Sequence, residues 1–295
     1  MLQDIKTVSR ARAGNELFSI LIPTWNNLAY LKLGLDSLRS HSHFPHQFIV
    51  AVNEGTDGSL DWIREQPDID YIHAPYNLGI CCALNACRKL IRTEYVVYAN
   101  DDMYFLPGWD LILKEEIDKI GHKNFMLSAT MIEPRGRGDG CRVLADYGSD
   151  PACFREKELL EDHHSLKRAD WSGSTWPPNI VHIDLWDLVG GLSLEFSPGM
   201  YSDPDFSKKL WKVGVRTFIG KGESLVYHFA CKTTGRIKKN DGRKTFLMKW
   251  GFSSKIFTTK YLKRGQPARP ALTDEDLSPG ERWLQRLKRL VTCLK

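Results

Sequence analysis

The sequence predicts an α/β protein with a mostly parallel central sheet that helices cover on both faces. Two observations lead to this prediction: short apolar strands alternate with helical segments up to residue 102, and polar residues follow directly after the strands. Each helical crossover between parallel strands places a helix on one face of the sheet. Because ligands of such sheets bind at the carboxyl ends of the strands, the polar residues there are the first candidates for a site.

The expected elements of the first half follow from apolar runs and from leucine spacing. FSILIP at 18–23 is a short apolar run that ends in a proline, and leucines then repeat at helical spacing through 27–41. A second apolar run at 48–58 is punctuated by glycines. The remaining expected elements are a helix at 59–66, a strand at 68–75, a helix at 77–92 and a strand at 94–102 that ends in acids.

The second half has a less regular pattern. Residues 133–151 indicate a loop or short antiparallel structure. We expect a helix over 202–214 that begins near Ser202 or Asp203, and a last strand over 222–232.

Length and composition set limits on the class of protein. The chain has 295 residues, 42% of them hydrophobic, which is enough for one large domain or two smaller ones. A formal net charge of +5 mildly favours anionic partners, although no motif for nucleic-acid recognition is present, so none is expected as a partner. The first residues lack a secretory apolar region, and no stretch approaches the roughly 20 apolar residues of a membrane span. We therefore expect a cytoplasmic protein with reduced thiols.

The strongest local signal is the sequence Asn100, Asp101, Asp102, which follows the apolar strand YVVYA directly. Two adjacent acids at the carboxyl end of a strand can hold a hard divalent cation, which in turn neutralises a diphosphate. The alternative is that the acids cap the next turn, where Asp is common.

Seven motifs resemble, in their order, the inverting family 2 glycosyltransferases of the GT-A fold. They are ILIPTWNN, VNEGTDGS, YNLGICCALN, NDDMYFLPGW, VGGLSLEF, SDPDF and VYH, and they cover most of Phe18 to His228. The resemblance implies a Rossmann-like, mostly parallel sheet with a small antiparallel acceptor-side portion and a C-terminal helical tail. It implies a catalytic domain over 17–250, made of a nucleotide-sugar-binding half (17–124) and an acceptor and catalytic-base half (125–250), followed by an extension over 251–295.

The resemblance assigns donor binding to residues that follow the first four strands. Asn53 stands where the family usually has Asp, and a neutral amide can both donate and accept hydrogen bonds. Asn77 and Gly79 fit an ordinary turn equally well. The assigned donor residues are Pro23, Thr24, Trp25, Asn53, Glu54, Asn77, Gly79 and Asp101.

The resemblance also implies a divalent cation, Mn²⁺ or Mg²⁺, that bridges the phosphates of the donor. Its ligands would be Asp102 and His228, the histidine that follows the strand SLVY. Imidazole joins carboxylates most readily on transition metals, which slightly favours Mn²⁺. The alternative for a lone histidine is a structural role.

Transfer with inversion needs a carboxylate that takes the proton from the acceptor hydroxyl. The resemblance assigns this base to Asp203, although the family's usual Glu-Asp is Ser202-Asp203 here. Asp205 and Trp176 are assigned to the acceptor site, where aromatic faces suit sugar rings. The alternatives are that both acids only favour a helix N-terminus and that Trp176 packs in the core.

Two basic segments complete the sequence. Lys232 and Arg236 lie in a basic loop that would close over the diphosphate, or would simply be solvated. The tail at 281–295 has apolar residues at helical spacing with basic residues largely on its other faces. Such a helix is expected on an anionic membrane surface, or docked on the catalytic domain or a second subunit.

Together these patterns predict a metal-dependent inverting glycosyltransferase. It would move a sugar from a nucleotide-diphosphate sugar to a hydroxyl of a glycan or lipid-linked glycan, in the cytoplasm or on the inner face of the cell membrane. Family analogy alone suggests bacterial surface polysaccharide synthesis. One alternative is a sugar nucleotidyltransferase, although the first strand ends in PTWNN and not in a glycine-rich basic loop. The other is a non-catalytic glycan- or nucleotide-binding module, which would need no base such as Asp203.

Overall fold

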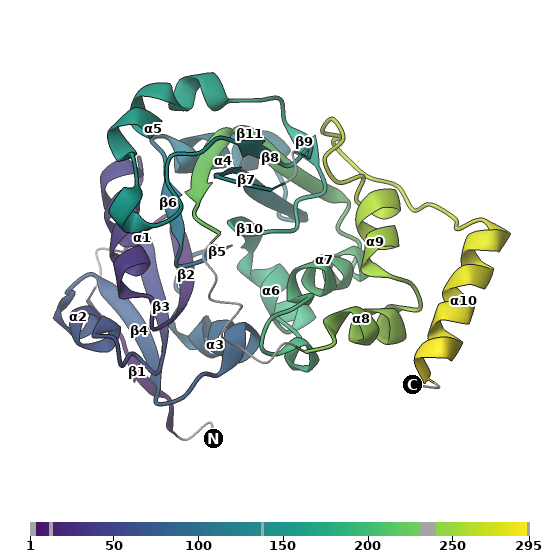
Figure 1. The fold of residues 1–295 in the computed structure, drawn as a ribbon, viewed down its shortest axis with the longest axis horizontal. Coiled ribbons are helices and arrows are strands. Elements are labelled where there is room, and N and C mark those ends of the chain that lie inside the picture. Colours follow the sequence, from purple (N-terminus) through teal and green to yellow (C-terminus); the bar gives the residue numbers. More distant parts are fainter. Residues whose placement is uncertain (1–3, 12–13, 137–138, 231–239, 294–295) are drawn as a thin grey trace.

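The computed structural model describes residues 4–11, 14–136, 139–230 and 240–293. Its strands form a single sheet and are β1 (Lys6–Val8), β2 (Phe18–Trp25), β3 (Gln47–Asn53), β4 (Ile69–Ala74), β5 (Tyr95–Tyr98), β6 (Met103–Phe105), β7 (Phe125–Glu133), β8 (Arg142–Leu144), β9 (Trp171–Ser172), β10 (Asn179–His182) and β11 (Thr217–His228). The main path across the sheet is β1-β4-β3-β2-β5-β10-β7-β11-β6 (Figure 1). Beside this path, β8 pairs with β7 and β9 pairs with β11.

The sheet is mostly parallel, as the sequence predicts. Strands β4, β3, β2 and β5 run in one direction, and β7 and β11 are parallel to each other. Strand β10 lies antiparallel between β5 and β7, while β6 and β9 pair antiparallel with β11. These three short strands form the small antiparallel portion on the β7–β11 side, and β1 adds a further antiparallel strand at the opposite edge, beside β4.

Strand β8 differs from the prediction of a loop or short antiparallel structure at 133–151. It pairs with β7 in parallel, with Arg142 opposite Met131 and Leu144 opposite Glu133. The intervening chain therefore returns to the level of Met131 before the new strand begins, and a tight hairpin is not formed. Strand β2 also runs past its predicted end at Pro23, because β3 still pairs with it there while the ladder to β5 has ended at Leu21.

Both faces of the sheet are buried, because successive strand residues point to opposite faces. In β2, Ile20 and Ile22 belong to the apolar cluster on one face and Leu21 to the cluster on the other. The helices of the first face are α1 (Leu28–His41), α2 (Ser59–Glu65) and α4 (Trp109–Ile120), and those of the second are α3 (Gly79–Cys87), α6 (Ile183–Val189) and α7 (Ser202–Lys212). Helix α5 (Glu156–Asp162) covers a third, smaller aromatic cluster.

The chain after residue 240 packs against α7. It forms α8 (Gly242–Trp250), α9 (Ser254–Ile256), a π-helical turn (Phe257–Tyr261) and, after a long connection, α10 (Pro279–Cys293). Phe257 is fully buried in the same cluster as α7. The Lys208 ammonium of α7 lies 5.1, 5.1 and 5.0 Å from the ring centroids of Phe252, Phe257 and Tyr261. Each ring attracts the cation, so the position of α7 depends on this later segment.

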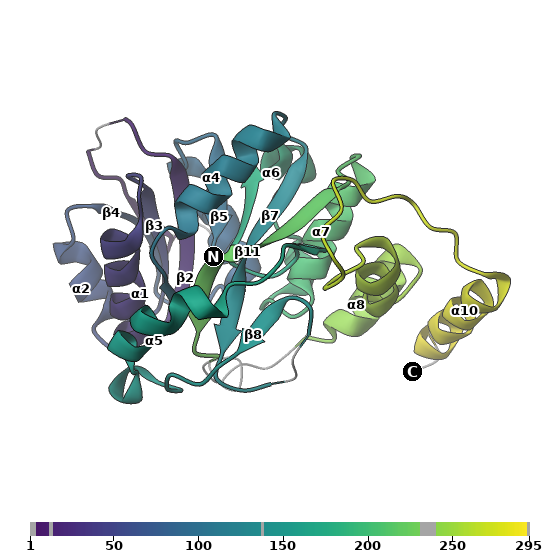
Figure 2. The same cartoon turned by 90° about the horizontal axis from the view of Figure 1, so that it is seen from above.

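Helix α10 lies at the end of the molecule furthest from α2 in both views (Figures 1 and 2). None of the helices in the described ranges combines the length and the apolar character that crossing a bilayer requires.

Candidate active site

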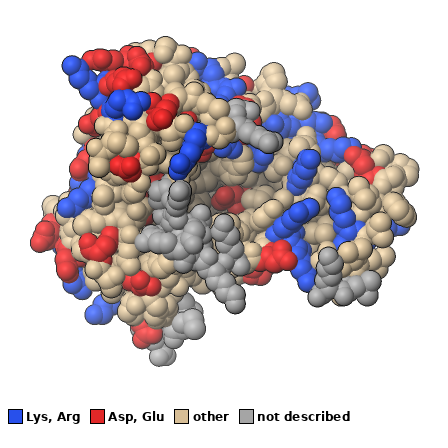
Figure 3. Space-filling view, in the orientation of Figure 1, with Lys and Arg blue, Asp and Glu red and all other residues tan. Residues whose placement is uncertain are grey.

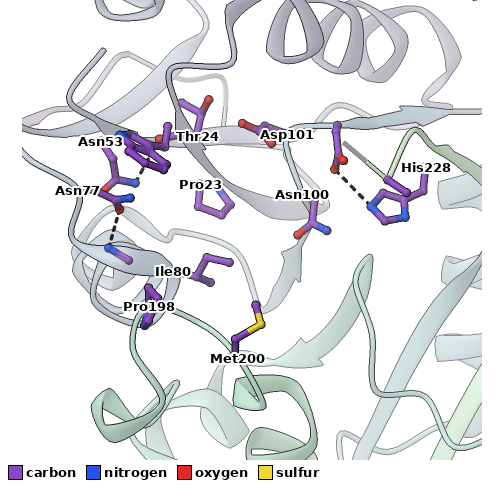
Figure 4. Close-up of a pocket in the computed structure, with 14 residues that line it drawn as sticks. Pro23, Thr24, Asn53, Asn77, Ile80, Asn100, Asp101, Pro198, Met200 and His228 are labelled. Atoms are coloured by element: carbon purple, nitrogen blue, oxygen red, sulfur yellow. Dashed lines mark hydrogen bonds and ion pairs between the residues drawn. The ribbon is translucent and has the colours of Figure 1, made fainter. Parts of the chain in front are cut away.

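A cavity of about 360 Å³ lies at the carboxyl ends of β2, β3, β5 and β11, the edge at which parallel sheets bind ligands. Nine predicted residues line it: Pro23, Thr24, Trp25, Asn53, Asn77, Gly79, Asp101, Asp102 and His228. Pro198 and Met200, from the loop before α7, face them from the other side (Figure 4). On the face seen in Figure 3 the molecule is hollowed at its centre, with acidic atoms in the floor and Lys or Arg side chains on the rim.

Asn53 connects two strand ends to α3. Its Nδ2 donates to the carbonyl of Thr24 (3.1 Å), and its Oδ1 accepts from the N–H of Leu78 (2.9 Å). An aspartate carboxylate can only accept, so it would lose the bond to Thr24. The amide at this position is therefore explained by its two backbone partners, and it shapes the cavity in addition to lining it.

Gly79 lets α3 approach the loop before α7. Its φ is +70°, and a Cβ at this position would lie 2.7 Å from the Cα of Pro198. The next residue, Ile80, donates its N–H to the Pro198 carbonyl at 2.7 Å. Asn77 supports the turn, since its Oδ1 accepts from the N–H of Gly79 at 2.8 Å. Glycine is needed here because a side chain would meet both the strained backbone angle and the neighbouring loop.

Glu54 lies beside the cavity and is not part of its lining. Its φ is +60°, and its Oε2 accepts from Nδ2 of Asn26 at 3.0 Å. The carboxylate thus braces the loop that follows β2.

Asp101 and Asp102 place two adjacent carboxylates at the end of β5. Burial and the charge of Asp102 raise the pKa of Asp101 to about 7, and this effect exceeds the lowering effect of the Thr24 and Asn27 side chains. Neighbouring carboxylates in a site shielded from water disfavour each other's ionised form. A cation placed between them and a diphosphate would relieve that repulsion.

His228 connects this acid pair to a third carboxylate. Its Nε2 lies 3.4 Å from Oδ1 of Asp102, and its Nδ1 lies 2.8 Å from Oε1 of Glu133 (Figure 4). Burial alone would lower the pKa of His228, but the two carboxylates raise it to about 10. Both ring nitrogens therefore carry protons at neutral pH as long as no other cation replaces one of them.

The arrangement fits a divalent cation held by Asp102 and His228. Two ligand atoms bound at right angles to one ion at about 2.1 Å lie about 3.0 Å apart, close to the 3.4 Å between Nε2 and Oδ1. Glu133, on the opposite ring nitrogen, is the kind of partner that orients metal-bound histidines. In the described part of the chain no three His, Cys, Asp or Glu side chains form a ligand set. Asp102 and His228 are therefore the residues that would hold the ion.

Glu133 is the functional residue that the sequence prediction missed. It ends β7, and its second oxygen pairs with Arg142 at 2.5 Å, which also pairs with Asp139 at 3.1 Å. The available signal was FMLSATMIE, an apolar strand that ends in an acid as YVVYANDD does. Only the sheet order, which places β7 beside β11, brings this acid to His228.

Asp203 lies half-buried in the first turn of α7, three residues after Met200, and is not itself among the residues that line the cavity. Burial raises the pKa of its carboxyl to about 7. The carboxylates of Asp203, Asp101 and Asp102 all raise the pKa of Tyr98, so the three acids lie within reach of one side chain. Tyr98 in turn donates to Oδ1 of Asn100 at 3.0 Å.

Comparison with known proteins agrees with this geometry. Residues 19–140 match the family model described as Glycosyl transferase family 2. The match covers less than half of the chain, and residues 19–140 are called the family 2 segment below. A curated relative, the uncharacterized glycosyltransferase MG025 homolog of Mycoplasma pneumoniae, is 26% identical over 158 residues, which are 50% of this chain and 50% of the relative. The aligned part therefore spans half the length of that relative.

Solved structures share the fold of the whole described chain. GalNAc-T7 with UDP, GalNAc and Mn²⁺ has a TM-score of 0.58 at 13% identity and covers 95% of this chain and 55% of its own. S. aureus TarS 1-349 has a TM-score of 0.56 at 15% identity, and the match covers 94% of this chain and 71% of the TarS chain. The structure of TarS 1-349 in complex with UDP-GlcNAc has a TM-score of 0.52 at 15% identity, and the match covers 94% of this chain and 72% of that chain. At these identities the likeness concerns the fold alone, and it confirms the predicted GT-A fold.

The family 2 segment contains Asp101, Asp102 and Glu133 but ends before Asp203 and His228. Asp203 comes from α7 and His228 from β11, and the fold returns His228 to the edge where the family 2 segment places its acids.

Asp205 corrects one predicted assignment. Its side chain is fully buried, and it accepts hydrogen bonds from Ser193 Oγ (2.6 Å), Trp250 Nε1 (2.8 Å) and Lys249 Nζ (2.9 Å). An acceptor sugar cannot reach a carboxylate with these surroundings. Because Asp205 follows Asp203 by two residues on a helix, it points to a different side of α7 and attaches α8 there.

Trp176 is engaged by two arginines. The guanidinium carbon of Arg142 lies 4.8 Å and that of Arg264 4.0 Å from its ring centroid. The ring is therefore already in contact with two cations, and it supports the arginine that holds Glu133. Lys232 and Arg236 lie outside the described residues, so their role as a lid stays a prediction.

His228→Asn should reduce, by about one, the number of protons released per bound Mn²⁺ at about pH 7.5. The reason is that the His228 ring, with a pKa of about 10, must lose its Nε2 proton before it can bind the ion. Calorimetric titration in buffers of different ionisation enthalpy measures this number. His122, an exposed histidine, is the matched control, and His122→Asn should release as many protons as the wild type. If the wild type, His228→Asn and His122→Asn all released the same number of protons, the ion would bind at a site that does not include His228.

Asp205→Ala should lower the free energy of unfolding by about 3–5 kcal/mol, because it removes a buried carboxylate that accepts three bonds and takes away the partner of the Trp250 indole N–H. Asp203→Asn, two residues away, should change stability by less than about 1 kcal/mol. Urea denaturation of both variants makes the comparison. If Asp205→Ala were as stable as the wild type and lost only acceptor affinity, the predicted role of Asp205 in the acceptor site would be correct after all.

Proposed function

We propose that this protein is a metal-dependent inverting glycosyltransferase that transfers a sugar from a nucleotide-diphosphate sugar to a hydroxyl of a glycan or lipid-linked glycan. One observation carries the proposal: Asp102 and His228 pair at the edge of the cavity in a way that suits a cation and a diphosphate, and the charges of Asp102 and of Asp203, in the first turn of α7, act on the same side chain, Tyr98. A protein that only binds a nucleotide needs no base such as Asp203.

Support for the donor class comes from the shape of the cavity and from two structural neighbours. The nucleoside would lie against Thr24, Asn53 and Asn77, and the diphosphate would point to Asp102 and His228 (Figure 4). Among the neighbours, GalNAc-T7 was solved with UDP and TarS in complex with UDP-GlcNAc. We therefore propose a uridine diphosphate sugar as the first donor to test.

A bound Mn²⁺ or Mg²⁺ would stabilise the negative charge that develops on the departing diphosphate. The chain's own contribution is to hold the ligands in place. Asp102 and His228 would bind the ion, and Glu133 with Arg142 would fix the orientation of the imidazole ring. The GalNAc-T7 structure was solved with Mn²⁺, which supports this choice of ion.

Asp203 is proposed as the general base. A carboxylate with a pKa near 7 retains more basicity than an ordinary aspartate and is still substantially ionised at neutral pH. It would take the proton of the acceptor hydroxyl while that oxygen attacks the anomeric carbon from the face opposite the diphosphate. Holding both substrates in one cleft supplies the orientation that this displacement needs.

The wider role rests on family analogy. We propose assembly of a bacterial surface polysaccharide in the cytoplasm as the setting. We further propose that neutralising Lys232 and Arg236 together raises the KM for the donor, because their charges would pair with those of the diphosphate.

Asp203→Asn should reduce the rate of donor hydrolysis, with water as acceptor, by about 10²–10⁴-fold while donor affinity stays within about twofold. In the wild type, kcat/KM should fall about tenfold per pH unit below about pH 7 and level off above it, because the base acts only when it is ionised. Asp184→Asn is the matched control, since Asp184 is also an acid in the first turn of a helix but lies at the surface paired with Lys123. An unchanged rate and pH profile in Asp203→Asn would remove Asp203 from the mechanism.

Release of nucleoside diphosphate should be seen with one member of a panel of UDP-, GDP- and dTDP-sugars, and it should require a divalent cation. EDTA should abolish it and Mn²⁺ restore it. Asp102→Ala should lower the release at subsaturating Mn²⁺ by at least about tenfold, because a ligand to the ion is lost. If no panel member binds with or without Mn²⁺, the non-catalytic module becomes the better explanation.

A further inference from the structure

The start of helix α10 is capped by hydrogen bonds between its own residues. The N–H of Glu281 donates to Oγ of Ser278 (3.2 Å), and the N–H of Ser278 donates back to Oε2 of Glu281 (2.9 Å). This reciprocal pair is a capping box, and Pro279 occupies the first helical position, where its missing N–H is harmless. The helix is therefore set up to form in water before any partner is present.

The polar side of α10 is the side that docks on the protein. Gln285 is 3% exposed, and its Oε1 accepts from the N–H of Ser253 at 3.0 Å. One turn earlier, Glu281 pairs with Lys260 at 2.5 Å. Lys288 and Thr292, which follow Gln285 at helical spacing, are also partly covered. A polar stripe thus holds the helix in place.

The apolar side of the same helix faces outward. Half of the large hydrophobic side chains that are exposed among the described residues lie on this one helix, which argues against chance. They are Trp283 (64% exposed), Leu284 (43%), Leu287 (41%), Leu290 (63%) and Val291 (46%). An amphipathic helix that served only to cover its own protein would be turned the other way.

Basic residues border this apolar side. At about 100° per residue, Arg282, Arg286 and Arg289 fall along one flank, between the docked stripe and the apolar side. All three are exposed. Long basic side chains beside an apolar stripe can keep their charges among headgroups while the stripe enters the acyl boundary.

We propose that the outward face of α10 binds the surface of an anionic lipid bilayer, with Trp283 and the leucines in the interface and the arginine flank against the headgroups. The charge of the flank selects an anionic surface, because each arginine near such a surface favours binding by about fivefold. The polar docked stripe fixes the catalytic cavity relative to the membrane. The inference concerns binding alone and does not rest on the proposed reaction.

A second copy of the chain fits this face less well. In a two-fold antiparallel pair of helices, each flank meets the same flank of the partner, so the arginines of both copies would adjoin and repel. In a parallel pair, the arginine flank would face the side on which the partner helix carries its own protein body.

The test uses the full chain and flotation with vesicles of phosphatidylcholine alone or mixed with phosphatidylglycerol. Leu290→Glu is the main variant, and Leu188→Glu is its matched control, because Leu188 on α6 is 66% exposed against 63% for Leu290. Both substitutions are at the surface, and thermal unfolding checks that both variants fold. Light scattering after gel filtration measures the oligomeric state of every protein.

We expect the wild type and Leu188→Glu to float with the anionic vesicles and not with phosphatidylcholine alone, and Leu290→Glu to bind at least about tenfold more weakly. A variant that combines Arg282→Gln, Arg286→Gln and Arg289→Gln should bind about 100-fold more weakly than the wild type at low ionic strength, and the difference should shrink at high salt.

The proposal is overturned if the wild type does not float, or if both glutamate variants float equally well. It is also overturned if the wild type is a dimer that Leu290→Glu dissociates, since a second copy would then cover the face. Donor hydrolysis in solution is measured separately, so loss of vesicle binding leaves the proposed reaction untouched.

Discussion

The site depends on two ion pairs that share one ring: His228 lies between the carboxylates of Asp102 and Glu133. Carboxylates from the ends of β5 and β7 approach one histidine from β11, and each contributes to its charge. Without the ring between them, two buried acids would face each other at one edge of the sheet. The histidine links three strands that are distant in sequence, and Arg142 extends the chain of charges to β8. The same two contacts position the ends of the strands and keep the ring of His228 protonated.

The carboxyl groups in and near the cavity differ in pKa because their surroundings differ. Asp101 and Asp203 both have a pKa raised to about 7, the first by burial and a charged neighbour and the second by burial alone. The pKa of Glu133 is instead lowered, since the bonds and charges of His228 and Arg142 outweigh the effect of its burial. Environments that push the pKa values of neighbouring acids apart are typical of sites where acids have separate roles. The proposed division between Asp203 as the base and Glu133 as a supporting acid agrees with that separation.

Helix α7 is the element that joins this chemistry to the rest of the chain. Its first turn carries Asp203, while Asp205 and Lys208 fasten other sides of the same helix to α8 and to the aromatic segment after it. Burial lowers the pKa of Lys208 to about 8, yet three rings surround its ammonium group. The segment beyond residue 250 therefore takes part in positioning α7, which carries the proposed base, although it lies outside the family 2 segment.

The sequence by itself determined the alternation of strands and helices, the parallel sheet, the acids at the end of β5 and the helix that carries Asp203. These features depend on local patterns: apolar runs, leucine spacing and acids placed next to strand ends. The tertiary structure alone decided that Glu133 reaches His228, that Asp205 is buried, and that Trp176 is covered by arginines. The physical reason is that these contacts join residues far apart in sequence through the order of the strands, and a period of two or 3.6 residues carries no information about that order. The amphipathic character of α10 was likewise legible in its sequence, but which of its faces docks on the protein was decided by the contacts of Gln285 and Glu281.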